Sequence, residues 1–305
     1  MCVCMKYKKR IVLVISVLGV IALLLIYHTR QGEEEITFSQ KELVWNTGGE
    51  LQILSGIENK IMRSAQGDVK EIPVSKQVGG YESICPGMHA GKRQESEKKT
   101  EDKTVYLTFD DGPSRQTEKI LNILDRYGIK ASFFVVSSGL TESGVDALKR
   151  AAQSGHIIGM HSGTHDYKQI YASVEALLKD YEKVYKMIQE TTGQTPIIYR
   201  FPGGSYNTIG KQCIQQAIPE MERRGFVYFD WNVTAEDAVG TPTASSIKKN
   251  IFKNLNQIVQ PVILMHDGPC NSLTVEVLPE IIEELIQRGY SFDTLDHREP
   301  CYFNW

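Results

Sequence analysis

The feature that most constrains the fold is an alternation of short β-rich runs with helix-forming segments, which begins at Thr104. Segments such as 117–127, 173–192 and 278–287 carry apolar residues at helical spacing on one face. The β-rich runs around them are 104–109, 131–136, 156–160, 197–201, 226–229, 262–265 and 290–295. Strands that alternate with helices in this way pair in parallel. The pattern therefore predicts a parallel α/β barrel or an open doubly wound sheet.

The chain before this domain divides into three segments of different composition. Residues 1–10 are basic, and residues 11–27 form an uncharged run, IVLVISVLGVIALLLIY. Residues 28–103 are polar, and their last part contains no large apolar side chain from position 91 onward. Such composition predicts an extracellular stalk and a flexible linker, because it cannot offset the entropy cost of ordering. The folded domain would then occupy residues 104–305.

The apolar run at 11–27 is long enough to span a bilayer as a single helix, which takes about 17–25 residues. Basic residues precede it and Glu33, Glu34 and Glu35 follow it, so the amino terminus is expected inside and the carboxyl terminus outside. A cleaved signal peptide is the alternative. No small-x-small cleavage site follows the run, which favours an uncleaved anchor in the cell membrane and an extracellular domain.

The composition of the whole chain excludes few classes of protein. The chain has 305 residues, with 41% hydrophobic and 23% charged, which is typical of globular proteins. A net charge of −3 gives no support for a nucleic-acid partner, and no obligate protein partner is evident. Cys2 and Cys4 would lie inside the cell. The four cysteines on the outer side, which allow 3 disulfide pairings or, with less support from their spacing, a zinc site, are Cys85, Cys213, Cys270 and Cys301.

Polar residues able to do chemistry follow the β-rich runs at the point where each run ends. In a barrel of parallel strands these ends open on one rim, where barrel enzymes keep their active sites. The residues concerned are Asp110, Asp111, His161, His165, Arg200, Asp230, Asp237, His266 and Asp267. We therefore expect them to gather into one site.

Two of these residues, His161 and His165, have a spacing that suits one metal ion. A carboxylate from Asp110 or Asp111 would complete a set of two histidines and one acid with open positions, which is a catalytic arrangement. The same set suits non-haem iron, but nothing indicates an oxygenase, so zinc-dependent hydrolysis is favoured. The second carboxylate would accept a proton. The alternative is that the two acids belong to a simple turn capped by Ser114.

Four motifs occur in a characteristic order, and together they resemble the polysaccharide deacetylases, carbohydrate esterase family 4, also called the NodB-homology domain. The motifs are Thr108-Phe-Asp-Asp-Gly112, His161-Ser-Gly-Thr-His165, Arg200-Phe-Pro-Gly-Gly204 and Leu264-Met-His266. The likeness covers about residues 104–295. It implies a distorted parallel barrel of seven or eight strands, preceded here by one transmembrane helix and a stalk.

The resemblance also implies a role for each matching residue. Asp110 would be the general base, held by Arg200, and Asp111, His161 and His165 would bind a divalent metal. Zinc is expected, with cobalt or nickel as alternatives.

On the other side of the site, the resemblance implies that His266 is the general acid. Asp237, which matches the family pattern better than Asp230, would tune it. Many relatives have tryptophan where this chain has Ala238, which bears on substrate choice. The residues that would shape the substrate groove, the acetyl pocket and the oxyanion site are Pro202, Gly203, Tyr206, Trp231 and Leu264.

The layout is similar to that of membrane-anchored peptidoglycan N-acetylglucosamine deacetylases. The resemblance therefore implies a hydrolase that removes N-acetyl groups from a cell-wall polysaccharide, most simply peptidoglycan. Two alternatives within the enzymes are a chitin-oligomer deacetylase and an O-acetyl xylan esterase. An inactive carbohydrate-binding protein is an alternative of another class, although the metal ligands, the base and the acid are all present in the sequence.

Overall fold

The computed structural model describes residues 43–45, 51–53, 80–93 and 103–303. The chain divides into two units, residues 1–75 and 76–305. In the first, strands β1 (Leu43–Trp45) and β2 (Leu51–Ile53) pair antiparallel, within the range predicted as a stalk. The predicted anchor at 11–27 lies outside the described residues. None of the helices in the described part of the chain is long and apolar enough to cross a bilayer.

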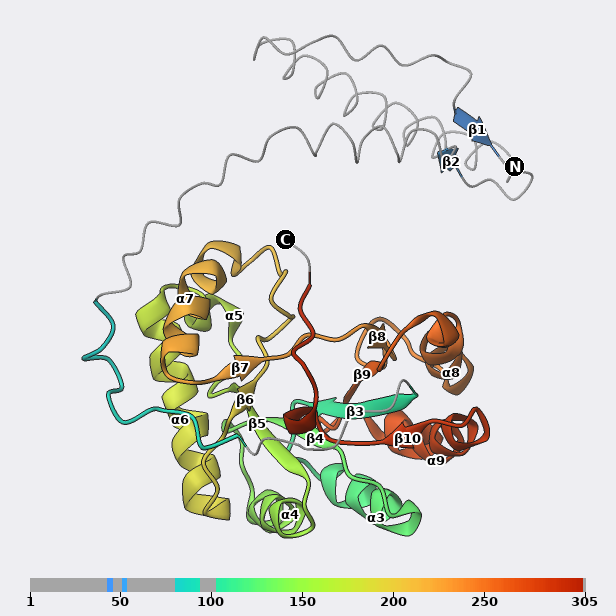
Figure 1. The fold of residues 1–305 in the computed structure, drawn as a ribbon, viewed down its shortest axis with the longest axis horizontal. Helices are drawn as coiled ribbons and strands as arrows, with labels where there is room; N and C mark the ends of the chain where they lie inside the picture. Colours follow the sequence, from blue (N-terminus) through green and yellow to red (C-terminus); the bar gives the residue numbers. More distant parts are fainter. Residues whose placement is uncertain (1–42, 46–50, 54–79, 94–102, 304–305) are drawn as a thin grey trace, which may run out of the picture. The chain divides into compact units, whose positions relative to one another are not determined.

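The second unit is built on a parallel sheet with helices outside it (Figure 1). The strands are β3 (Thr104–Asp110), β4 (Ser132–Val136), β5 (Ile157–Ser162), β6 (Ile198–Tyr199), β7 (Val227–Tyr228), β8 (Val233–Thr234), β9 (Val262–His266) and β10 (Ser291–Phe292). Seven of them follow the order β7-β6-β5-β4-β3-β9-β8, while β10 pairs with the start of β3. All pairs in this sheet are parallel.

This strand order is that of a barrel with one open seam. Going round from β3, each next strand in the chain is the next neighbour, and β9 closes back onto β3. Within this path of seven strands, β7 and β8 are the only consecutive strands without a ladder between them. The predicted parallel α/β architecture is confirmed, with seven strands in the main path. The doubly wound alternative is not, because the order never reverses.

The helices bury one face each against the sheet. They are α3 (Thr117–Tyr127), α4 (Glu142–Gln153), α5 (Tyr167–Ile170), α6 (Val174–Thr192), α7 (Lys211–Arg223), α8 (Ala244–Phe252) and α9 (Ser272–Gln287), with 3-10 turns η1 (Leu255–Gln257) and η2 (Leu295–His297). Helix α6 begins where the Ser173 side chain accepts a hydrogen bond from Ala176 N and ends at Gly193, whose φ is 72°. The first is an ordinary start signal for a helix, and the second is an ordinary stop signal.

Two apolar clusters lie on the two faces of the sheet. On β4, Phe133 belongs to the cluster under the helices, and its neighbour Phe134 belongs to a smaller cluster with Tyr106 and Phe229. Neighbouring strand residues point to opposite faces. Every residue of β3 is buried, which is what a parallel strand covered on both sides requires.

The folded unit extends upstream of the predicted boundary at Thr104. Arg224, which is 2% exposed, pairs with Glu220 at 2.7 Å. Its guanidinium also donates to the backbone carbonyls of Tyr81, Ile84, Cys85 and Met88. The segment 80–93, placed in the stalk by its composition, is thereby fixed to this unit. An arginine that binds backbone carbonyls leaves no sequence pattern, so composition alone missed the contact.

The four cysteines predicted to lie outside the cell, Cys85, Cys213, Cys270 and Cys301, are unpaired. Burial raises the pKa of the Cys85 and Cys213 thiols to about 11. Neither thiol is therefore a ready nucleophile.

Candidate metal and catalytic site

The candidate residues meet at the carboxyl ends of the strands. Asp110 ends β3 and Asp111 follows it, while His161 lies near the end of β5. His266 ends β9 and is the register partner of Asp110. Because these parallel strands end on one rim, residues far apart in sequence become neighbours.

Asp111, His161 and His165 bring their ligand atoms within 4.8 Å of one another. Asp111 Oδ1 lies 3.5 Å from His161 Nε2 and 3.2 Å from His165 Nε2. Two ligand atoms about 2.1 Å from a common tetrahedral ion would be about 3.4 Å apart. Asp111 Oδ1 is also buried without a hydrogen-bond donor in the described residues. A shared cation would satisfy this oxygen, so the three side chains fit a divalent metal.

Hydrogen bonds behind the ligands fix their orientation. His161 Nδ1 lies 2.9 Å from the backbone carbonyl of Arg200, to which it donates. The Nε2 lone pair is then free to face Asp111, as a metal ligand requires.

The turn after β3 depends on a glycine. A Cβ on Gly112 would lie 2.1 Å from Oδ2 of Asp267, a carboxyl that is 1% exposed. Asp267 accepts a hydrogen bond from Thr117, and burial raises its pKa to about 7. Asp111 itself has φ of 75°, in the left-handed region. The Asp267 carboxyl therefore packs tightly against this turn, and this contact fixes the direction of the Asp110 and Asp111 side chains.

Asp110 is held by a fully buried arginine. Arg200 Nη1 donates to Asp110 Oδ1 at 2.8 Å and to the Thr108 hydroxyl at 2.9 Å. Its remaining donors bind the backbone carbonyls of Phe229 and Asp230. The other oxygen of Asp110, Oδ2, lies 3.8 Å from His161 Nε2. One oxygen is thus fixed by charge, and the other faces the candidate metal site.

His266 is held from behind by Asp237, which is buried. Asp237 Oδ1 lies 2.8 Å from His266 Nδ1, and its Oδ2 accepts from His266 N and from the hydroxyl of Thr274. Burial alone would lower the pKa of His266, but the Asp237 carboxylate outweighs burial and raises it to about 9. A histidine in this state is a proton donor at neutral pH. Asp230 makes no such contact; it binds Ser205 and Phe303 N.

Of the residues predicted to line the groove, all but Leu264 lie on loops. Gly203 has φ of 76° and packs on Tyr167, and the carbonyl of Pro202 accepts from Tyr171. Tyr206 is 53% exposed, and Leu264 is buried on β9.

Trp231 is half-buried, with the Arg200 guanidinium 5.6 Å from its ring centre and the centre of the Phe303 ring 4.9 Å away. Ala238, at the position where tryptophan was expected, is exposed.

Three residues that support the site were missed from the sequence. Asp180 accepts hydrogen bonds from the loop between His161 and His165, Thr274 donates to Asp237, and Phe303 packs on Trp231. Asp180 left a usable signal, because it is a charged residue on the apolar face of α6 beside Leu177, Tyr181 and Val184. Thr274 lies in α9, far from Asp237 in sequence, and no sequence pattern predicted the hydrogen bond between them.

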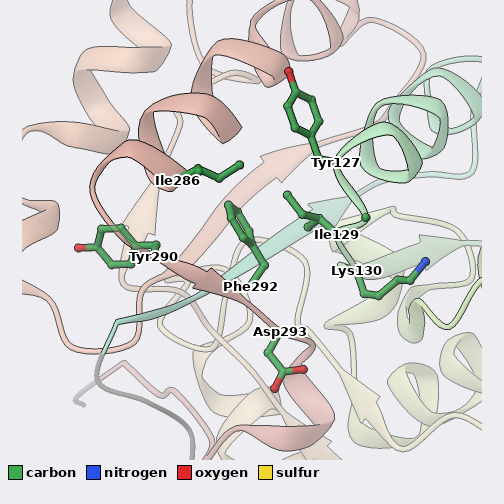
Figure 2. A pocket seen from close by; sticks show the side chains of 8 residues that line it. Tyr127, Ile129, Lys130, Ile286, Tyr290, Phe292 and Asp293 are labelled. Atoms are coloured by element: carbon green, nitrogen blue, oxygen red, sulfur yellow. The ribbon is translucent and has the colours of Figure 1, made fainter.

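A pocket elsewhere on the domain contains none of these residues. It has a volume of about 350 Å³ and is lined by Ile129, Ile286 and Phe292, with Lys130 and Asp293 at one end (Figure 2). Ile129 and Lys130 come before β4, so this pocket lies at the end of the strand away from the rim.

Comparisons with known proteins identify the family of this chain. The model of the polysaccharide deacetylase family matches residues 97–217. The putative polysaccharide deacetylase YheN of Bacillus subtilis is 34% identical over 209 residues, which cover 67% of this chain and 71% of the relative. The chain belongs to the polysaccharide deacetylase family. It is therefore a hydrolase of a family that depends on a divalent metal and acts on acetyl groups of carbohydrates.

Other polysaccharide deacetylases are similar over the same region. A peptidoglycan-N-acetylglucosamine deacetylase of Bacillus cereus is 31% identical, covering 67% of this chain and 72% of the relative. The catalytic domain of peptidoglycan N-acetylglucosamine deacetylase from Eubacterium rectale superposes with a TM-score of 0.64 at 32% identity, covering 68% of this chain and 95% of that domain. The polysaccharide deacetylase Bc1974 from Bacillus cereus gives 0.57 at 28%, covering 66% and 97%.

Proposed function

We propose that this deacetylase removes acetyl groups from N-acetylglucosamine residues of peptidoglycan, with zinc as its metal. The observation that carries the proposal is the grouping on one rim of a metal-binding triad, a carboxylate held by arginine and a histidine held by a carboxylate. Two relatives named as peptidoglycan-N-acetylglucosamine deacetylases support the choice of polymer. Two histidines and one carboxylate support zinc.

Each group has a distinct task in amide hydrolysis. A divalent cation held by Asp111, His161 and His165 would polarise the acetamide carbonyl and acidify the attacking water. Asp110 accepts the proton of that water through Oδ2, because Arg200 occupies its Oδ1. A backbone N–H near Gly203 stabilises the oxyanion, a type of contact worth about 3–4 kcal/mol.

The carbon–nitrogen bond breaks only if the amine leaves as a neutral group. His266 gives it a proton, and Asp237 stabilises the imidazolium before this step. Water and the acetamide are thereby converted to acetate and a free amine on the sugar.

We also propose that residues 11–27 anchor the enzyme in the cell membrane with the catalytic domain outside. The support is the length of this apolar run and the basic residues before it. A tether favours a substrate fixed beside the cell. Labelling of an introduced cysteine in the catalytic domain of intact cells with a membrane-impermeant reagent tests this topology, and protection from the reagent contradicts it.

The substrate proposal is tested by acetate release from the purified full-length protein. We expect peptidoglycan to be deacetylated faster than chitin oligomers, and acetylated xylan to be the poorest substrate. Asp111→Ala and His161→Ala are expected to lose bound zinc and at least about 1,000-fold in acetate release. His266→Ala should keep zinc and lose amide hydrolysis. Full activity of Asp111→Ala or His161→Ala would rule out the proposed metal site. Faster acetate release from acetylated xylan than from peptidoglycan would rule out peptidoglycan as the preferred substrate.

A further inference from the structure

We propose that Asp180, on α6, is a positioning residue that holds the loop carrying both histidine ligands in its metal-binding conformation. The inference rests on the proposed metal site and is independent of which polysaccharide is the substrate. Asp180 lies outside all four motifs of the family resemblance, between residues that pack in the core. Its side chain is nevertheless aimed at the loop after β5.

The contacts of Asp180 are almost all with this loop. Its Oδ2 accepts hydrogen bonds from the Ser162 hydroxyl at 2.7 Å and from Gly163 N at 2.6 Å. Its Oδ1 accepts from Thr164 N at 2.9 Å and from the Thr164 hydroxyl at 2.8 Å. One buried carboxylate, 4% exposed, therefore binds every residue between His161 and His165.

Ser162 passes this constraint on to the second ligand. Its oxygen donates to Asp180 and accepts from His165 N at 2.8 Å and Thr164 N at 3.2 Å. His165 has φ of 56°, in the left-handed region that side-chain-bearing residues seldom adopt. A backbone in this region persists only when its surroundings impose it. Here those surroundings are the Ser162 oxygen and the carboxylate beneath it.

The loop also approaches Asp180 as closely as its backbone allows. A Cβ on Gly163 would lie 2.5 Å from the Asp180 carbonyl oxygen and 3.0 Å from its Oδ1. The absence of a side chain at Gly163 thus lets the loop lie directly on α6. Helix and ligand loop are coupled at this point.

The arrangement needs a carboxylate and not merely a polar side chain. All four groups around Asp180 donate hydrogen bonds, two to each oxygen. An asparagine offers only one oxygen, and its amide nitrogen would face two donors. Among the described residues, no lysine or arginine forms an ion pair with Asp180, and these four hydrogen bonds hold its carboxylate. Charge-assisted bonds of this kind are about twice as strong as neutral ones.

The test compares zinc affinity in Asp180→Asn with that in Glu175→Gln, using full-length protein and a chelator competition with zinc alone. Glu175 is a matched control, because it lies on the same helix, loses the same charge and pairs only with exposed Lys179. We expect Asp180→Asn to bind zinc about 10–100-fold more weakly, as when a ligand loses its outer support, and Glu175→Gln to stay within about twofold of wild type.

A merely structural role would lower the melting temperature of Asp180→Asn without changing the zinc affinity of its folded fraction, and that result would overturn the proposal. If Asp180→Asn does not fold, Ser162→Ala removes the hydroxyl that joins Asp180 to His165 N and Thr164 N and leaves the Asp180 carboxylate in place. We expect it to lose about threefold to tenfold in zinc affinity, and unchanged affinity would equally overturn the proposal. Asp111→Ala separates the two claims, since retention of zinc there would count against the metal site itself.

Discussion

Asp110 and Asp111 are neighbours in the chain, yet their surroundings give them different chemistry. Asp110 faces a buried guanidinium through one oxygen, whereas Asp111 faces two imidazole nitrogens. The first arrangement pairs one carboxylate oxygen with a guanidinium and leaves the other oxygen facing the candidate metal site, and the second creates a place for a cation. The division of roles between base and ligand follows from these partners and not from the two side chains themselves.

The same reasoning predicts the pH dependence of the acid. Asp237 raises the pKa of His266 to about 9, so the proton donor is present below that pH and lost above it. In Asp237→Asn the carboxylate is gone, and the alkaline limb of kcat/KM is expected to move towards the ordinary histidine value of about 6.5. At pH 8 the zinc-loaded variant should be at least about tenfold slower for this reason alone. A pH profile of acetate release measures this.

Thr274→Val is the matched control for that profile. It removes a hydrogen bond to Asp237 and leaves the carboxylate charge in place. The limb should shift much less than in Asp237→Asn. An Asp237→Asn limb at the wild-type pH would show that another group is the acid.

At the scale of elements, the turn after β3 packs against the segment that follows β9. The hydroxyl of Ser114 donates to the Asp267 carbonyl, and Asp267 N donates to the Asp110 carbonyl. Gly112 lies against the Asp267 carboxyl with no room for a methyl group. The position of both carboxylates therefore depends on how two loops fit together.

Gly112→Ala is expected to force these loops apart. Its Cβ would meet Asp267 Oδ2 at 2.1 Å, and overpacking of this kind costs about 1–3 kcal/mol in the free energy of unfolding. Zinc affinity should fall with it, since Asp111 is the next residue. Denaturant unfolding and chelator competition measure the two effects.

Two further variants control this experiment. Gly87→Ala adds the same methyl group where no atom lies within 4 Å, and it should be close to neutral. Adding Asp267→Ala to Gly112→Ala removes the clashing carboxyl and should restore part of the lost stability. If Gly112→Ala has the same free energy of unfolding as wild type, the turn does not pack tightly against Asp267.

At the scale of the whole molecule, what the sequence predicted and what it did not have a common physical cause. Strand ends are visible as apolar runs followed by polar residues, so the rim at Asp110, His161 and His266 could be expected. The two-residue strand β8 left no such run. Contacts such as Asp180 with Ser162 or Arg224 with Cys85 join residues through the fold, and only the packed structure brings them together.

The open seam of the barrel is a second feature that only the whole molecule reveals. Asp230, at the end of the segment after β7, donates its N–H to the Cys301 carbonyl at 2.7 Å. In the same segment, Arg298 donates to the Gln260 carbonyl just before β9, the strand that pairs with β8. Cys301 packs beside the inner cluster of the barrel. The segment 298–303 thus occupies the place where β7 and β8 do not pair.

Asp230 is the residue that fastens this segment. Its carboxylate is fully buried and accepts from Ser205 N, the Ser205 hydroxyl and Phe303 N. Asp230→Ala leaves these donors without an acceptor, at about 1–3 kcal/mol each, so we expect the free energy of unfolding to fall by at least about 3 kcal/mol. Asp146→Asn, at an exposed position on α4, should change it by less than about 0.5 kcal/mol.

The two acidic candidates after β7 are separated by the same measurements. Asp230→Asn keeps one accepting oxygen, so it should remain folded at low temperature, with reduced stability and an alkaline limb of kcat/KM close to that of wild type. In Asp237→Asn we expect the reverse, namely a larger change in the pH profile than in stability. If the pH profile changes equally in both variants, the seam and the catalytic acid are coupled. The contact between Phe303 and Trp231 would then affect the catalytic histidine.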